Sequence, residues 1–252
     1  QTPSINIGDH TGYVLDLNSW SVDNLPVLSA DFSHISALRL TDSPSGQLPF
    51  HFMQRFPNLR VLSLENNHLP ELPASLASLS NLTDLNLQGN QVVLTSGAVE
   101  LLSGLRKLKS LNLTGNPLGR RISVRQLPDL EYLRLRHTQI SEWPQGVETL
   151  THLHTLDLRD NAIIHIPSEI LTAQRAAINR VTNLHDNPLN ADSIRRLDIY
   201  RREQGINLGV EVQHMHARSA RGILHWAREP TLVQTRIWND LSSLRQSRSF
   251  FR

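Results

Sequence analysis

Leucine recurs along the middle of the chain in one fixed figure: leucine, two residues, leucine, one residue, leucine. In an extended segment successive side chains point to opposite faces, so Leu62 and Leu64 share one face while Ser63 and Glu65 share the other. Each such stretch is therefore predicted to be a short strand with one buried face. The stretches are LRVLSLENNHL (59–69), LTDLNLQGNQV (82–92), LKSLNLTGNPL (108–118), LEYLRLRHTQI (130–140) and LHTLDLRDNAI (153–163).

The figure repeats with a nearly constant period. Its second leucine lies at positions 15, 38, 62, 85, 111, 133 and 156, with Thr182 in the last repeat, so the steps are 22 to 26 residues. This period is typical of leucine-rich repeats, whose units stack because none can bury its apolar face alone. The sequence predicts an α/β solenoid of about eight repeats, with a curved parallel sheet on its concave face. An ordinary α/β domain with leucines at this period by chance is disfavoured, because six units keep the same sequence pattern in register.

A polar residue follows each strand at a fixed offset and is predicted to be structural. An asparagine there can donate to and accept from the turning backbone, and Thr138 can do only part of this in its repeat. The longer steps, from Leu85 to Leu111 and from Leu156 to Thr182, are expected to add residues to the return path. Prolines 49, 73, 144 and 167 are expected to set φ where that path begins. The asparagines are Asn67, Asn90, Asn116, Asn161 and Asn187.

The repeat pattern is lost at both ends of the chain, and these departures predict the domain boundaries. Residues 1–12 are expected to be an end piece, residues 13–189 the repeats and residues 190–209 a capping helix and exit. Asn190 or Asp192 can begin this helix and Gly205 can end it. Trp20 stands where the first repeat should have its asparagine. Residues 210–252 are predicted to form a helical tail, because apolar residues at helical spacing follow Pro230.

The composition adds exclusions. The chain has no cysteine, which excludes disulfides, thiolate metal sites and a cysteine nucleophile within its 252 residues. It has no run of about 18 apolar residues, so no membrane span is predicted. Its 25 basic and 23 acidic side chains nearly balance. A nucleic-acid-binding protein is expected to gather basic side chains on one face, so this class is disfavoured. Because it begins at Gln1 without a signal-like segment, we expect it to be a piece of a longer protein.

Two segments near the end resemble a known family. LHDNPLNADSIRRLDIYRREQGINLG (184–209) resembles the junction that leaves the repeats in bacterial NEL-domain ubiquitin ligases, the IpaH- and SspH-like effectors. RIWNDLSSLRQSRSFF (236–251) resembles the first helix of their catalytic domain, and the repeats from residue 25 onward are also similar. The resemblance implies that residues 210–252 contain a linker and the start of that domain.

The same resemblance implies a function for the longer protein. Members transfer ubiquitin through a cysteine that would lie beyond Arg252, so no catalytic residue is expected in this chain. The repeats would choose a protein substrate and restrain the ligase, while the missing domain would meet ubiquitin and a ubiquitin-conjugating enzyme. The resemblance also implies that the longer protein is a virulence effector, which a bacterium would secrete and which would act in the host cell cytoplasm.

Charged and aromatic side chains gather at the outward positions of two neighbouring repeats. Tyrosine and arginine are enriched among interface anchors, so these residues are the predicted partner-binding cluster. The alternative is a solvated face on which the arginines and aspartates pair with each other, at about 0–1 kcal/mol per pair. The cluster consists of Tyr132, Arg134, Arg136, His137, Asp157, Arg159 and Asp160.

No cofactor or metal site is predicted. The 12 histidines are scattered, and pairs such as His152 and His154 lack the three or four converging ligands that a metal needs. The sequence therefore predicts a protein-binding module, the substrate-recognition part of a NEL-type ligase. The alternative is a stand-alone leucine-rich-repeat adhesion or scaffolding protein without a ligase. In the tail, Trp226 and Trp238 either pack the following domain or dock on the last repeats.

Overall fold

The computed structural model describes residues 4–7, 10–18, 30–42, 50–119 and 122–211. Predictions for Trp20, Pro49 and the tail after residue 211 lie outside these residues. The chain divides into two units, residues 1–209 and 210–252, and the description below concerns the first.

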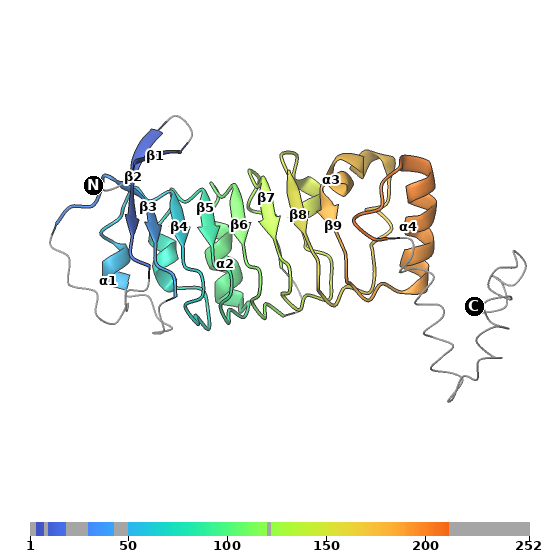
Figure 1. Ribbon diagram of the computed structural model, residues 1–252, viewed down its shortest axis with the longest axis horizontal. Coiled ribbons are helices and arrows are strands. Elements are labelled where there is room, and N and C mark those ends of the chain that lie inside the picture. The colour runs from blue at the N-terminus through green and yellow to red at the C-terminus, as the bar shows by residue number, and fades with distance from the viewer. Residues whose placement is uncertain (1–3, 8–9, 19–29, 43–49, 120–121, 212–252) are drawn as a thin grey trace, which may run out of the picture. The chain divides into compact units, whose positions relative to one another are not determined.

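Nine strands form one sheet in chain order (Figure 1). β1 is antiparallel to β2, and every later strand is parallel to the one before it. Eight parallel strands confirm the predicted α/β solenoid. Their bounds are β1 Ser4–Ile7, β2 His10–Asp16, β3 Ile35–Arg39, β4 Val61–Ser63, β5 Asp84–Asn86, β6 Ser110–Asn112, β7 Tyr132–Arg134, β8 Thr155–Asp157 and β9 Thr182–Asn183.

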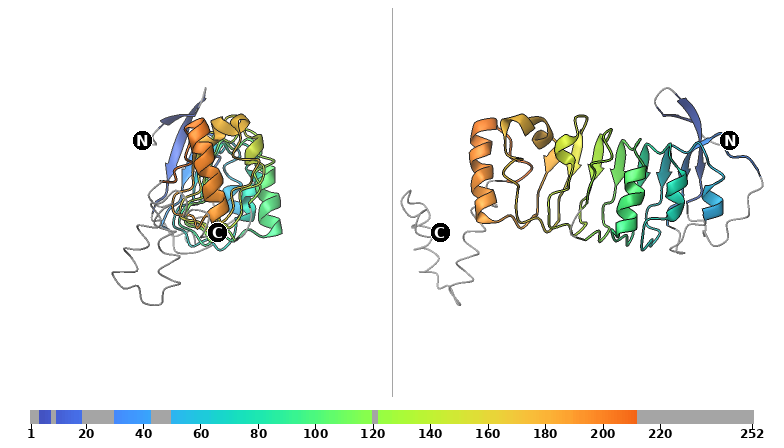
Figure 2. Two further views of the ribbon diagram at one scale, coloured as in Figure 1. Left: turned by 90° about the vertical axis from the view of Figure 1, so that its right-hand side faces the viewer. Right: turned by 180° about the vertical axis from the view of Figure 1, so that it is seen from behind.

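The return paths carry the helices. α2 (Ser96–Gly104) lies behind the strands in Figure 1 and in front of them in the reverse view of Figure 2. The two longer steps of the repeat contain α2 and α3 (Ala176–Arg180), so the extra residues lie on the return path. The other elements are α1 Phe50–Met53, α4 Ala191–Gln204 and 3-10 turns at Ala74–Ser78, Val147–Thr149 and Ala173–Arg175.

Leucine ladders fill the space between the sheet and the return paths. The second leucine of each figure pairs in register with the next along the sheet, from Leu38 to Leu156. These side chains are at most 1% exposed, and Leu76 from a return path is fully buried with them. Removing apolar surface from water is the main force that holds the stack together, at about 25 cal/mol per Å². The middle members are Leu62, Leu85, Leu111 and Leu133.

A second ladder, of asparagines, joins the repeats on the inside of the turn after each strand. Asn90 donates from Nδ2 to the carbonyl oxygens of Leu64 and Leu87, both at 2.8 Å. Its Oδ1 accepts from the backbone N–H groups of Asn67 and Leu69, both at 3.0 Å. One buried amide thus satisfies backbone groups of two repeats that no strand reaches.

Thr138 interrupts this ladder. Its hydroxyl is 2.8 Å from the carbonyl oxygen of Leu135, in the same repeat, and 3.0 Å from Oδ1 of Asn161, in the next. The preceding repeat is reached by the backbone instead, because Leu118 N–H donates to the carbonyl oxygen of Thr138 at 3.1 Å. Threonine therefore replaces only part of the asparagine's bonds.

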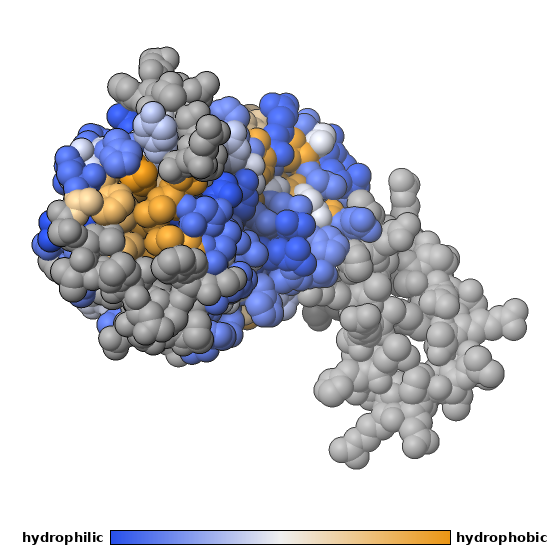
Figure 3. Space-filling view, turned by 60° about the vertical axis from the view of Figure 1, so that its left-hand side comes forward, coloured by the Kyte–Doolittle hydropathy of each residue, from blue (hydrophilic) through white to orange (hydrophobic). Residues whose placement is uncertain are grey.

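Each end of the stack has a different cover. At the C-terminal end, Asn190 accepts from the Ser193 N–H at 2.9 Å and begins α4, and Gly205 ends the helix with φ 70°. Leu197 and Tyr200 of α4 are buried. At the N-terminal end, the predicted end piece contains β1 and the start of β2, which form an antiparallel hairpin. Figure 3 shows apolar side chains gathered at this end of the stack.

Candidate functional site

The outward side chains of the parallel strands form two polar rows on the concave face. The strand register pairs each member of the first row with the next, so residues as far apart in the chain as Asp16 and Asn183 share one surface. A second row follows two residues later in each repeat. The first row is Asp16, Arg39, Ser63, Asn86, Asn112, Arg134, Asp157 and Asn183. The second row is Asn18, Thr41, Glu65, Gln88, Thr114, Arg136, Arg159 and His185.

The predicted partner-binding cluster lies on two neighbouring repeats, and most of its charges pair internally. Arg159 holds Asp157 of its own repeat with two hydrogen bonds, Nε to Oδ1 at 2.8 Å and Nη2 to Oδ2 at 2.6 Å. Arg136 reaches across to Asp160 of the next repeat, with Nε 2.5 Å from Oδ2. His137 lies in the turn after β7 with φ 54°. The alternative interpretation, a face of mutually paired charges, therefore describes four of the seven side chains.

Asp157 is the most buried charge of the cluster. Its residue is only 8% exposed. Burial alone would raise the pKa of its carboxyl, but the side chain and backbone N–H of Arg159, with the charge of Arg136, hold that pKa below its ordinary value. The carboxylate stays ionised and fixes the direction of Arg159.

Tyr132 and Arg134 form a separate group within the cluster. The guanidinium carbon of Arg134 is 5.5 Å from the centre of the Tyr132 ring, a distance typical of a cation–π contact. His154 of the next repeat also stacks on this tyrosine, with ring centres 5.8 Å apart. His154 was not among the predicted residues, although its position one residue before β8 placed it beside Tyr132. Arg134 is thus oriented by an aromatic ring and not by an acid.

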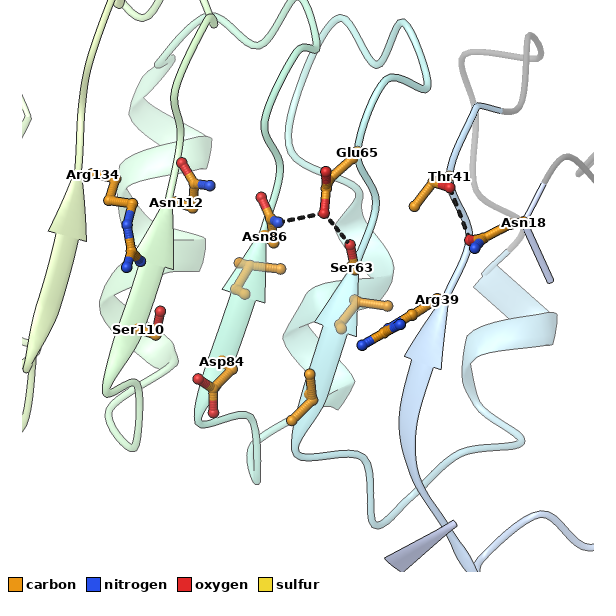
Figure 4. Close-up of a pocket in the computed structure, with 13 residues that line it drawn as sticks. Asn18, Arg39, Thr41, Ser63, Glu65, Asp84, Asn86, Ser110, Asn112 and Arg134 are labelled. Atoms are coloured by element: carbon orange, nitrogen blue, oxygen red, sulfur yellow. Dashed lines mark hydrogen bonds between the residues drawn. The ribbon is translucent and has the colours of Figure 1, made fainter. Parts of the chain in front are cut away.

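Two hollows lie on the described part of this face. The first hollow, of about 500 Å³, lies over β3 to β7, and Figure 4 shows its side chains converging from these strands. Its floor carries Ser63, Asn86 and Asn112, with Arg39 and Arg134 toward its two ends. The middle repeats were not predicted to form a site, because their outward positions are almost uncharged. The signal present in the sequence is the run of small hydroxyl and amide residues, which leave room where long charged side chains would fill it.

The second hollow, of about 420 Å³, lies over β8 and β9. Asp157 and Arg159 line it together with Asn183 and the exit segment at Asn207 and Gly209. The predicted cluster therefore lies between the two hollows: Arg134 belongs to the first, and Asp157 and Arg159 to the second.

The described residues contain neither a membrane span nor a metal centre. In that part of the chain, no helix has the length and apolar character needed to cross a membrane. The same residues contain no group of three or more histidine, cysteine, aspartate or glutamate side chains arranged to hold a metal ion.

Comparison with known proteins identifies the repeats. A family described as leucine rich repeat matches residues 33–92, and a second family of that description matches residues 104–120 and 149–164. Podocan-like protein 1 of Mus musculus is 34% identical over 173 residues, which cover 67% of this chain and 29% of the relative. Adenylate cyclase of Schizosaccharomyces pombe is 29% identical over 160 residues, 62% of this chain and 9% of the relative.

A solved structure agrees with these matches. The LRR protein LIC12759 of Leptospira interrogans superposes with a TM-score of 0.58 and 28% identity, covering 69% of this chain and 43% of the other. The chain spans less than half of each relative named here. These matches support leucine-rich repeats and point to no NEL-type ligase.

Proposed function

We propose that this leucine-rich-repeat solenoid is a protein-recognition module that holds its partner on the concave face. The observation that carries the proposal is the pair of rows of polar side chains, in register over eight parallel strands and hollowed in two places. Solenoids use extended concave surfaces of this kind for binding. The first hollow combines amide and hydroxyl groups with arginines at its margins, which suits hydrogen bonding to a polypeptide.

Within the predicted cluster, Arg134 is expected to contribute most to partner binding. Arg136 and Arg159 already have aspartate partners at 2.5 and 2.6 Å, and a binding protein would have to compete for them. Arg134 is held by the Tyr132 ring, which leaves its five N–H donors available for a carboxylate. Tyrosine and arginine are both common among interface hot spots.

Site-specific photo-crosslinking tests the surface while the identity of the partner is still open. A photoreactive amino acid is placed at Asn112 on the concave face, and at Ala77 on the exposed return path as the matched control. We expect the Asn112 variant to capture a discrete protein that the Ala77 variant does not capture. Capture from Ala77 with none from Asn112 would overturn the proposal.

For the whole protein, we propose a secreted bacterial NEL-type ubiquitin ligase that acts in the host cell cytoplasm. The support is the resemblance of residues 184–209 and 236–251 to the repeat exit and first catalytic helix of that family. The coding sequence beyond Arg252 is expected to contain a helical domain with Cys-x-Asp, and the full-length protein to build ubiquitin chains with a ubiquitin-conjugating enzyme. A full-length protein without such a domain or activity would instead be a stand-alone adhesion or scaffolding protein.

A further inference from the structure

The first row of the concave face has a symmetric charge pattern. Reading along the sheet, an acid and an arginine are followed by three neutral residues, and then by an arginine and an acid. These seven residues lie on seven consecutive strands, so the pattern is a property of the sheet and not of any local segment. The members in order are Asp16, Arg39, Ser63, Asn86, Asn112, Arg134 and Asp157.

Neither arginine pairs with the acid beside it. Asp157 is occupied by Arg159 of its own repeat, and Asp16 accepts from the backbone N–H of Asn18 at 3.1 Å. Among the described residues, no carboxylate lies within ion-pair distance of Arg39 or Arg134, whereas Arg136 and Arg159 both have one. Within the part of the chain that the structure describes, the two arginines are therefore cations without an acidic partner.

Both arginines are directed over the hollow. In Figure 4, Arg39 extends from β3 toward β4, and Arg134 lies between β7 and β6. They are four strands apart, which corresponds to about 19 Å between their backbones at about 4.8 Å per strand. Because an extended chain advances about 3.3 Å per residue, a peptide that crosses the strands would place residues four to six positions apart beneath the two guanidinium groups.

The floor between the arginines limits what can bind there. Glu65 accepts from Ser63 Oγ at 3.0 Å and from Asn86 Nδ2 at 2.6 Å, so neutral donors fix this carboxylate without cancelling its charge. Asp84 also lines the hollow and accepts from the Thr83 hydroxyl at 2.8 Å. These two acids repel a ligand that is negative along its whole length, such as a nucleic acid, and leave only the ends of the hollow attractive to anions.

We propose that this hollow binds an extended peptide segment that carries a carboxylate side chain at each end and no acidic residue between them. Guanidinium groups grip carboxylates with paired hydrogen bonds, and the amide and hydroxyl side chains of the floor can bond the peptide backbone. This statement rests on the proposed function, because it names the kind of partner that the concave face accepts.

Fluorescence anisotropy with labelled decapeptides tests the proposal on the full chain. The peptides have a neutral polar background and two glutamates spaced by two, four, five or six positions, with the matching glutamine peptides as controls. Spacings of four to six are expected to bind roughly tenfold to a hundredfold more tightly than the glutamine peptides, and a spacing of two is not. A third glutamate at the centre is expected to weaken binding, and a lysine there to be tolerated.

Variants of the protein separate binding from folding. Arg39→Ala and Arg134→Ala are each expected to weaken the best peptide at least tenfold. Arg106→Ala, which removes an exposed arginine just after α2 on the return path, is expected to leave its affinity unchanged. Arg134→Glu should bind a peptide in which one end glutamate is replaced by lysine. A merely structural role of Arg134 could not produce this exchange of preference.

The outcomes also distinguish this proposal from the one on which it rests. Equal binding of the glutamate and glutamine peptides, or no effect of the two arginine variants, would overturn the acidic-peptide assignment. If the doubly substituted Arg39→Ala, Arg134→Ala chain still captures its partner by crosslinking from Asn112, the concave face is the binding surface but its ligand is not this peptide. If crosslinking from Asn112 captures nothing while the peptides bind as expected, only the protein-partner proposal fails.

Discussion

Replacing Asn90 by alanine is expected to destabilise the repeats by about 4 kcal/mol, because the side chain makes four buried hydrogen bonds at about 1 kcal/mol net each. Asn90 is 4% exposed, so water cannot replace the lost groups. The carbonyl oxygen of Leu87 keeps a second donor, Nδ2 of Asn116 at 2.8 Å. The N–H groups of Asn67 and Leu69 lose the side-chain acceptor that they share.

Two other asparagines provide the scale. Asn116 makes three close bonds of the same type, to the carbonyl oxygens of Leu87 and Leu113 and from the Val92 N–H, so its alanine variant should cost about 3 kcal/mol. Asn112 on the concave face is half-buried, donates to Gln88 Oε1 at 3.2 Å and accepts from the Thr114 N–H at 3.1 Å. Because this face is open to solvent, water can replace both contacts, and Asn112→Ala should cost less than about 1 kcal/mol.

Urea unfolding followed by circular dichroism measures these differences at neutral pH. An Asn90→Leu variant separates the hydrogen bonds from side-chain volume, because leucine fills the space without bonding the backbone. It should be destabilised about as much as Asn90→Ala. Equal stability of the Asn90→Ala and Asn112→Ala proteins would refute the structural role of the ladder, and full recovery in Asn90→Leu would assign the effect to packing.

Three further substitutions probe other features. The pKa of Asp157 is lowered in the folded chain, so the stability that this carboxylate contributes is full above the ordinary value of about 3.9 and is lost as pH falls through the lowered pKa. Urea unfolding should therefore show a larger advantage of the unchanged protein over Asp157→Asn at pH 7 than at pH 2.5, and an equal advantage at both pH values would contradict the lowered pKa. Gly146 has φ 86°, and an added Cβ would meet neighbouring backbone at 2.6 Å, so Gly146→Ala should lower the free energy of unfolding by about 3–4 kcal/mol. Gly205 has φ 70° but faces open space, so Gly205→Ala should lower it by only about 1–2 kcal/mol. Equal costs in urea would contradict this reasoning. Thr138→Asn should add a bond to the preceding repeat and raise stability by up to about 1 kcal/mol, and a lower urea midpoint would argue against it.

The period of the leucines predicts the solenoid because burial is common to all repeats. The spacing of Leu62 and Leu64 can be satisfied by only one face of a strand, and a neighbour with the same spacing must bury the same face. The hairpin of β1 and β2 was not predicted. The strand β1 does not contain the leucine pattern of the repeats. It pairs with β2, and the repeat pattern covers β2 only from residue 13 onward.

The arrangement of charges on the concave face could not be predicted from the period. The register places Asp157 directly beside Arg134, yet Asp157 bonds Arg159, two residues later in its own repeat. That choice depends on side-chain rotamers and on the aromatic ring that holds Arg134 in another direction. The sequence identifies which residues reach this surface, and the structure decides which of them remain available to a ligand.

Asparagine has two roles in this chain, and the contrast explains how folding and recognition are separated. Asn86 and Asn90 lie four positions apart in one repeat, but the first is half-buried on the concave face and the second is buried in the ladder. Asn86 donates to the side chain of Glu65 and accepts from the Gln88 N–H of its own repeat, whereas Asn90 bonds the backbone of two repeats. Positions equivalent to Asn86 carry aspartate, arginine, serine or asparagine in the other repeats, and each such change alters the binding surface. Positions equivalent to Asn90 tolerate less change, because the backbone of two repeats depends on them and Thr138 keeps only part of the asparagine's bonds.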